Sequence, residues 1–285
     1  MLIFFGEKVM EGKLDFKEIS KNIRRICVNQ VSRSNASHIG SMLSLVDIMT
    51  YLFYKELKLT KENYLEIKNR FVLSKGHASL VLYAILYDKG IIENIDAYCT
   101  NGSCLIGHLN HKVPGVGVST GSLGHGLSLA AGISLGLKMD RRMHNISKKT
   151  DNGMDKVYCV IGDGECNEGS IWESLIFIAN SNLDNLVIIV DANRLQGYDF
   201  TDKILPEERL INMLKSTGLD FYEADGHDYD EIAKAFDFAK HSNTTPILFF
   251  HTIKGKGVSY MENKLEWHYK SPNAEQLKTA LEELK

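Results

Sequence analysis

The order of apolar and polar positions along the chain predicts alternating helices and short strands. Apolar residues three or four positions apart, such as Phe16, Ile19, Ile23 and Ile26, are typical of an amphipathic helix. Short uninterrupted apolar runs bounded by turn residues are typical of buried strands. The pattern predicts helices at about residues 16–34, 43–53, 79–88, 170–181, 208–216 and 229–240, a small-residue helix ending near residue 139, and strands at 70–74, 156–161, 186–190 and 247–253.

This alternation predicts an α/β fold, with a mostly parallel sheet and helices on both faces, in a single domain spanning residues 1–285. Polar segments at about 140–155 and 197–207 predict surface loops, and the first of these has no functional interpretation. Ligands of such sheets bind at the carboxyl ends of the strands. The residues that follow the predicted strands are therefore the first candidates for a site.

Composition narrows the class of function. The chain has 285 residues, 44% of them apolar, and a formal net charge of −3, which argues against nucleic acid as the main partner. No run reaches the ~18 apolar residues of a membrane span, and the apolar start ends at Gly6, too early for a signal peptide. The five cysteines form no C-x-x-C pair, which predicts a reduced, cytoplasmic protein.

Two predicted strands end in residues suited to a metal ion. Gly162, Asp163 and Gly164 follow one strand, and Asn193 follows the next strand along the chain. If these strands are neighbours, Asp163 and Asn193 lie side by side and offer oxygen ligands, which Mg²⁺ and Ca²⁺ prefer. A Gly-Asp-Gly segment alone also fits an ordinary tight turn. The two strands together favour a site for a metal ion and a diphosphate.

Other candidates are weaker on residue chemistry alone. Lys254 follows a predicted strand and can meet a phosphate, but its segment also fits a basic, glycine-rich exit loop. Glu165 and Glu168 lie at a helix start, where the helix dipole favours carboxylates without any functional role. A glycine-rich turn at 119–126 opens a helix and also fits ordinary packing. Single loop histidines are mostly solvated or structural, whereas several meeting in one crevice can titrate and transfer protons.

These segments resemble the thiamine diphosphate signature of the transketolase family. The resemblance covers about residues 21–272 and is greatest to the amino-terminal half of a split transketolase, one encoded as two subunits. It implies a thiamine-diphosphate-binding fold with thiamine diphosphate and Mg²⁺ or Ca²⁺ as cofactors. It further implies that Asp163, Asn193 and the Leu195 carbonyl bind the cation, while the Gly164 amide faces the diphosphate.

The resemblance also assigns roles to other positions. Three histidines match residues that line the donor-sugar channel, bind hydroxyls and move protons, and one glutamate matches a member of an acid network across the subunit interface: His38, His108, His268 and Glu168. The remaining matches contact the cofactor: Ser41, His77, Gly121, Ser122, Leu123, Gly164, Glu165, Asn193, Gln196, Lys254 and His268. His125 is interpreted as structural, and His144, His227 and His241 as surface residues.

A second domain is expected on another chain. In the family, the glutamate that activates the cofactor and the pocket for its pyrimidine ring belong to a domain that this sequence does not contain up to Lys285. The chain is therefore expected to be inactive alone and to need a partner subunit in an α₂β₂ assembly. An exposed apolar surface near residues 121–126 is expected to meet that partner.

Function is predicted as the transfer of a two-carbon ketol unit from a ketose to an aldose. Two alternatives stay open: the α subunit of a 2-oxoacid dehydrogenase or a deoxyxylulose-phosphate synthase, and a non-catalytic protein that kept the cofactor fold. His38, His108 and the segment from Lys254 to His268 favour transketolase. Sugar phosphates and modified sugars both fit as substrates. Ile39, where a proline is usual in full-length members, is a departure from the family pattern.

Overall fold

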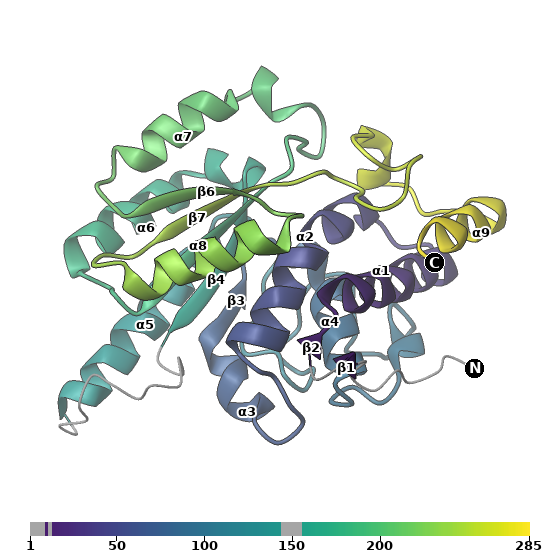
Figure 1. Cartoon of the computed structure of the whole chain (residues 1–285), viewed down its shortest axis with the longest axis horizontal. Helices are drawn as coiled ribbons and strands as arrows, with labels where there is room; N and C mark the ends of the chain where they lie inside the picture. Colours follow the sequence, from purple (N-terminus) through teal and green to yellow (C-terminus); the bar gives the residue numbers. More distant parts are fainter. Residues whose placement is uncertain (1–8, 11–12, 144–155) are drawn as a thin grey trace.

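A five-stranded, fully parallel sheet organises the chain (Figure 1). The computed structural model describes residues 9–10, 13–143 and 156–285. The sheet order is β3-β4-β5-β7-β6, and the strands are β3 (Phe71–Leu73), β4 (Val157–Gly162), β5 (Leu186–Ala192), β6 (Phe221–Asp225) and β7 (Ile247–His251). A short antiparallel pair, β1 (Val9–Met10) and β2 (Lys13–Leu14), precedes it.

Helices cover both faces of this sheet, which confirms the predicted α/β class. The main helices are α1 (Phe16–Ser34), α2 (Ile39–Tyr51), α4 (Ser79–Asp88), α5 (His125–Met143), α6 (Gly169–Ser181), α7 (Glu207–Lys215), α8 (Tyr229–His241) and α9 (Ala274–Glu283), and a short α3 (Tyr64–Ile67) precedes β3. In Figure 1, α9 lies beside α1.

Two separate apolar cores explain why the central strands carry almost no polar residues. Tyr158 and Val160 of β4 belong to the core shared with α1, α2, α4 and α8. Val157, Cys159 and Ile161 of the same strand belong to the opposite core, shared with α5, α6 and α7. Because successive side chains of a strand point to opposite faces, a strand buried on both faces must be apolar throughout. This requirement produced the apolar runs seen in the sequence.

Several predicted boundaries differ from the structure. Residues 140–143, expected in a loop, continue helix α5, and residues 144–155 lie outside the described residues. Helix α2 begins at Ile39, not near residue 43, because His38 caps it in a left-handed conformation with φ of 75°. Strand β6 and helix α9 were not predicted. In the part of the chain that the structure describes, no helix is both long and apolar enough to cross a membrane.

The sheet places the candidate residues at one edge. Gly162 of β4 pairs with Asp191 of β5, and the amide of Asp163 donates to the Asp191 carbonyl at 3.2 Å. Strand β7 pairs with β5 on its other side, so the segment after β7 also emerges at this edge. The carboxyl ends of β3, β4, β5 and β7 therefore meet around one space.

Candidate active site

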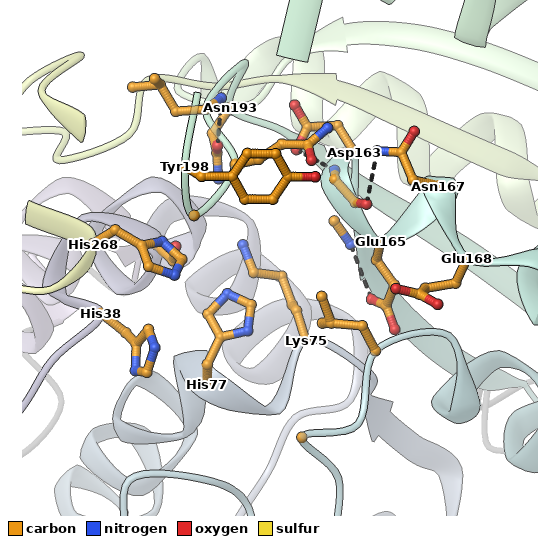
Figure 2. A pocket seen from close by; sticks show the side chains of 18 of the residues that line it. His38, Lys75, His77, Asp163, Glu165, Asn167, Glu168, Asn193, Tyr198 and His268 are labelled. Carbon is orange, nitrogen blue, oxygen red and sulfur yellow. Dashed lines mark hydrogen bonds between the residues drawn. The ribbon is translucent and has the colours of Figure 1, made fainter. Parts of the chain in front are cut away.

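A pocket of about 320 Å³ opens at the carboxyl ends of the strands (Figure 2). It brings together most of the residues expected from the sequence: His38, Ser41, His77, His108, Gly121, Leu123, Asp163, Gly164, Glu165, Glu168, Asn193, Leu195, Gln196 and His268. In Figure 2 the labelled histidines lie on one side of the pocket and the labelled acids on the other. Two expected residues do not line it. Ser122 is exposed on the glycine-rich turn, and Lys254 is fully buried behind the lining.

Asp163 is a buried carboxylate fixed by neutral donors. Its Oδ1 accepts from the Gly164 amide at 2.8 Å, and its Oδ2 accepts from the Arg194 amide at 2.8 Å and the Thr201 hydroxyl at 2.9 Å. Burial, together with the nearby charge of Asp191, raises the pKa of Asp163. No cationic side chain in the described residues forms an ion pair with it. Asp163 therefore presents a costly negative charge to the pocket.

Asn193 and Leu195 complete an oxygen-rich corner beside Asp163. The Asn193 Oδ1 accepts only from the Leu195 amide, at 3.2 Å, among the described residues. The Leu195 carbonyl accepts from Lys254 Nζ at 2.9 Å. Arg194 between them has a positive φ of 63°, which turns the chain so that its amide meets Asp163. Since an amide or carboxylate oxygen has two lone pairs, these oxygens retain capacity for a cation.

Gln196 provides an unpaired donor at the same corner. Its Nε2 is buried and has no hydrogen-bond partner in the described structure, although Gln196 lines the pocket. A Cβ on Gly164 would lie 3.0 Å from Gln196 Cγ, so the glycine leaves the room that this side chain occupies. A buried donor without a partner is costly unless a ligand completes it. The Gly164 amide, expected to face the diphosphate, is engaged by Asp163 in this structure.

A buried ion pair forms the floor of the pocket. The Lys75 ammonium donates to Asp191 Oδ2, which also accepts from the Ser44 hydroxyl at 2.7 Å, while Thr252 donates to the other carboxylate oxygen. Burial opposes ionisation of Asp191, but the Lys75 ammonium outweighs it and lowers the pKa of Asp191. Sequence reasoning missed this floor. Lys75 and Asp191 each follow a predicted strand, but their pairing depends on the order of the strands, which no local pattern reveals.

Four histidines meet at the pocket. Such a cluster, unlike a single loop histidine, indicates a functional role. The His38 ring lies 4.9 Å from His268, 5.3 Å from His77 and 5.7 Å from His108, measured between ring centroids. Burial, followed by nearby positive charges, lowers the pKa of His38 to about 4 and that of His268 to about 3. The same causes lower the pKa of His77. These three rings are neutral at pH 7 and can donate and accept hydrogen bonds.

The glycine-rich turn is tied to the Gly-Asp-Gly-Glu segment by Glu165. The Glu165 carboxylate accepts from the Ser74 hydroxyl, from the Gly124 amide at 2.7 Å and from the Gly162 amide at 3.3 Å. Burial raises the pKa of Glu165. Gly121 has a φ of 148°, and a Cβ there would lie 2.7 Å from the His108 ring. Glu165 thus holds the turn, and Gly121 makes room for His108.

The three histidines expected at the surface have three different outcomes. His241 is exposed, as expected, and His144 lies outside the described residues. The interpretation of His227 as a surface residue was wrong. Its side chain is only 8% exposed and forms hydrogen bonds with Asp47 and the Ile253 amide. Its neighbours in the sequence are polar, which suggested a surface position. Its partners, Asp47 and Ile253, lie far away along the chain.

Comparison with known proteins agrees with this geometry. Residues 16–284 match the family model described as transketolase, thiamine diphosphate binding domain. The chain belongs to the transketolase family. It is a transketolase subunit of the thiamine diphosphate binding type, and therefore part of a transferase.

Two transketolase subunits match over almost their whole length. The chain is 38% identical to an apulose-4-phosphate transketolase subunit of Phocaeicola vulgatus, covering 93% of this chain and 91% of the relative. It is 34% identical to 6-deoxy-6-sulfo-D-fructose transketolase subunit SqwG of a Clostridium species, covering 96% and 98%. The solved transketolase of Campylobacter jejuni superposes with a TM-score of 0.84 at 28% identity, covering 95% of this chain and 43% of that enzyme.

Proposed function

We propose that this transketolase subunit binds the metal–diphosphate end of thiamine diphosphate and part of a donor sugar, as one half of a two-subunit enzyme. The second subunit carries the pyrimidine-binding domain and the glutamate that activates the cofactor, and the assembly is α₂β₂. Residues 1–285 form the single diphosphate-binding domain. The reaction is the transfer of a two-carbon ketol unit from a ketose to an aldose.

The observation that carries this proposal is the buried, unpaired charge of Asp163 beside two further oxygens. A divalent cation held by Asp163, the Asn193 amide oxygen and the Leu195 carbonyl offsets that charge. The set contains one carboxylate, and no cluster of three or more His, Cys, Asp or Glu suited to a metal occurs among the described residues. Such a sparse set suits Mg²⁺, which completes its shell with phosphate oxygens, and Ca²⁺ accepts the same oxygens.

The diphosphate finds donors and positive charge around that cation. Gln196 Nε2 offers two unused N–H donors, and His77 faces the pocket from the end of β3. Lys254 acts from behind, because its ammonium donates to the carbonyls of Leu195 and Gln196. Burial and the charge of Lys75 lower the pKa of Lys254 to about 7. A bound anion favours the protonated form of such a lysine.

Neutral histidines suit the handling of sugar hydroxyls. When bound, thiamine diphosphate supplies the nucleophilic carbon that keeps the two-carbon unit. His38 and His268 then orient hydroxyl groups and accept or return their protons, since neutral imidazole offers both a donor and an acceptor. His108 lines the same pocket and contacts a further hydroxyl. His268 Nδ1 lies 3.0 Å from Lys254 Nζ, which leaves Nε2 for the pocket. Ser41 and Leu123 line the pocket beside them, and Gly121 gives His108 its place.

The partner subunit covers an apolar surface next to the glycine-rich turn. Leu129 of α5 and Ile176 and Phe177 of α6 are 43%, 65% and 45% exposed, and we call these three residues the partner surface. It is continuous with the site through the turn that begins α5 and through Glu168, which lines the pocket and precedes α6. Glu168 is exposed here and forms the acid network with the partner. Large exposed apolar side chains on adjacent helices indicate a protein contact.

The substrates are sugar phosphates or modified sugars. The two subunit relatives are named for apulose 4-phosphate and for 6-deoxy-6-sulfo-D-fructose, both small sugars with an anionic group. The residues that recognise the far end of the sugar lie on the partner. The five free cysteines fit a cytoplasmic, reducing setting.

An activity assay tests this proposal. The chain, its partner and their mixture are each supplied with thiamine diphosphate and Mg²⁺, and ketol transfer is followed from ketose phosphates and from sulfonated ketoses. We expect turnover only in the mixture. If cofactor binds to the mixture and no ketose is turned over, the protein is a non-catalytic member of the fold.

A further inference from the structure

Arg24, Asp47 and His227 form a buried chain of hydrogen bonds outside the pocket. The Arg24 guanidinium donates to both Asp47 oxygens, at 2.8 and 2.6 Å. His227 Nδ1 lies 2.7 Å from Asp47 Oδ2. The three side chains are only 7–8% exposed. Burial opposes ionisation of Asp47, but the charge of Arg24 and the bond from His227 outweigh it and hold the pKa of Asp47 well below its usual range.

Both ends of this hydrogen-bond network bind the same loop. The Ile253 amide donates to His227 Nε2 at 2.9 Å, and Arg24 Nε donates to the Lys256 carbonyl at 3.0 Å. Residues 253–257, which we call the lysine loop, include Lys254 between these two contacts. Arg24 of α1 and His227 before α8 therefore hold the loop on either side of Lys254, and Asp47 of α2 connects these two residues.

The hydrogen-bond pattern sets the tautomer of His227. Because the Ile253 N–H donates to Nε2, that nitrogen carries no proton. The ring proton is therefore on Nδ1 and is donated to Asp47. His227 thus connects a carboxylate, itself held by Arg24, to the backbone of the lysine loop.

The lysine loop has little freedom on its other side. The Gly255 amide donates to the Gly40 carbonyl at 2.9 Å, and a Cβ at Gly40 would lie 3.0 Å from Lys254 Cγ. Gly255 itself has a φ of 83° and lies against the Met261 backbone. A small displacement of the loop therefore moves Lys254 Nζ away from the carbonyls of Leu195 and Gln196.

We infer that Arg24, Asp47 and His227 are positioning residues that fix Lys254, and through it the Leu195 carbonyl, for cofactor binding. They touch neither substrate nor cofactor and act through the lysine loop. The inference rests on the proposed function, because it assumes that Leu195 and Lys254 belong to the diphosphate site.

Two substitutions at one position test the inference. His227→Gln can place its Oε1 near the position of Nε2 and keep an acceptor for the Ile253 N–H, whereas His227→Asn keeps a donor to Asp47 and loses that acceptor. Thiamine diphosphate affinity is measured for the Mg²⁺-containing pair of subunits. We expect about tenfold weaker binding for His227→Asn, as for the loss of one buried hydrogen bond, and less than about twofold for His227→Gln.

Amide hydrogen exchange of the chain without cofactor gives a second measurement. We expect the Ile253 amide to lose protection in His227→Asn and to keep it in His227→Gln. In a Lys254→Met background, His227→Asn should add no further loss of affinity. A purely structural role predicts equal effects of both variants, or unchanged affinity in His227→Asn, and either result overturns the inference. If the wild-type pair binds no cofactor, the proposed function fails. Separately, unchanged exchange of the Ile253 amide in His227→Asn would show that His227 does not hold the lysine loop.

Discussion

Asp163 bears a negative charge that the described residues surround with neutral donors. Its three hydrogen bonds come from two amides and a hydroxyl, and its pKa is raised by burial and by Asp191. Such an arrangement is stable when a cation completes it and costly when none is present. The residue is therefore better suited to the bound state than to the free chain.

The substitution Asp163→Asn separates these two states. We expect the free chain to lose no more than about 2 kcal/mol of stability, because removing a buried charge offsets the loss of the acceptor for at least one backbone N–H. Affinity for Mg²⁺ and thiamine diphosphate should fall at least tenfold. Chemical denaturation gives the first quantity and calorimetry of the subunit pair gives the second. A large loss of stability with unchanged affinity would make Asp163 a structural residue.

Gly121 is a second position where one side chain decides the geometry. Its φ of 148° and the 2.7 Å between a Cβ placed there and the His108 ring leave no room for alanine. We expect Gly121→Ala to displace His108 and reduce kcat of the assembled enzyme by at least tenfold. Steady-state kinetics measure this effect, and Gly169→Ala is the control, because a Cβ at Gly169 meets nothing within 4 Å. Equal effects of the two changes would contradict the account.

The pocket histidines predict how stability depends on pH. Burial lowers the pKa of His38 to about 4, below the value of 6.5 expected when unfolded. The unfolded chain therefore binds this proton first, so the free energy of unfolding falls as pH decreases from about 6.5 toward 4. We expect His38→Asn to reduce that slope, as measured by urea denaturation across this range. The exposed His241→Asn should keep the wild-type slope, and an unchanged slope in His38→Asn would count against a buried neutral His38.

At the residue scale, the sequence could predict which residues lie together at the ends of neighbouring strands. It could not predict which side chains from distant elements pair with one another. Asp163 and Asn193 were expected side by side because their strands are neighbours, and β4 pairs with β5 as required. The Lys75–Asp191 pair and the partners of His227 depend on elements that meet only after folding. A local pattern contains no information about such contacts.

At the scale of elements, prediction succeeded where both faces of a strand are buried. Strands β4 and β5 are buried throughout, so their apolar runs were evident. Strand β6 forms the edge of the sheet, and of its residues only Ala224 is buried. Glu223 and Asp225 interrupt the pattern there, because an edge strand is free to carry charges that keep other strands away. The polar sequence of β6 is thus a consequence of its position.

Helix α5 allows a direct test of the partner surface. A Cβ at Gly132 meets nothing within 4 Å, and Gly132 lies on the exposed side of α5, close to Leu129. We expect Gly132→Leu to leave the isolated chain folded, since leucine favours a helix more than glycine does. The added side chain should weaken binding to the partner by at least tenfold, measured by analytical ultracentrifugation.

A matched change on another helix controls for added apolar surface. Lys234→Leu introduces the same side chain on an exposed position of α8, on the opposite face of the sheet. It should leave partner binding unchanged. If Lys234→Leu weakens partner binding and Gly132→Leu does not, the partner contacts α8 and not α5, which would contradict the account.

At the scale of the whole molecule, the order of the strands defines the site and could not be predicted. Strand β7 inserts between β5 and β6, which brings the lysine loop beside the turn after β5. The sequence predicts parallel strands, but several strand orders satisfy the same apolar pattern. The resemblance to transketolases, not the periodicity, connected Lys254 with Asp163 in advance. The pocket histidines and the residues Asp163, Asn193 and Leu195 then line one pocket.

The central claim is that this chain provides the metal–diphosphate half of a shared cofactor site. Calorimetric titration of thiamine diphosphate with Mg²⁺ into the chain alone, and then into its mixture with the partner subunit, tests it most directly. The account predicts weak or absent binding to the chain alone and tight binding to the mixture, both abolished by omitting the divalent cation. Absence of binding in the mixture, or equally tight binding without any divalent cation, would contradict it.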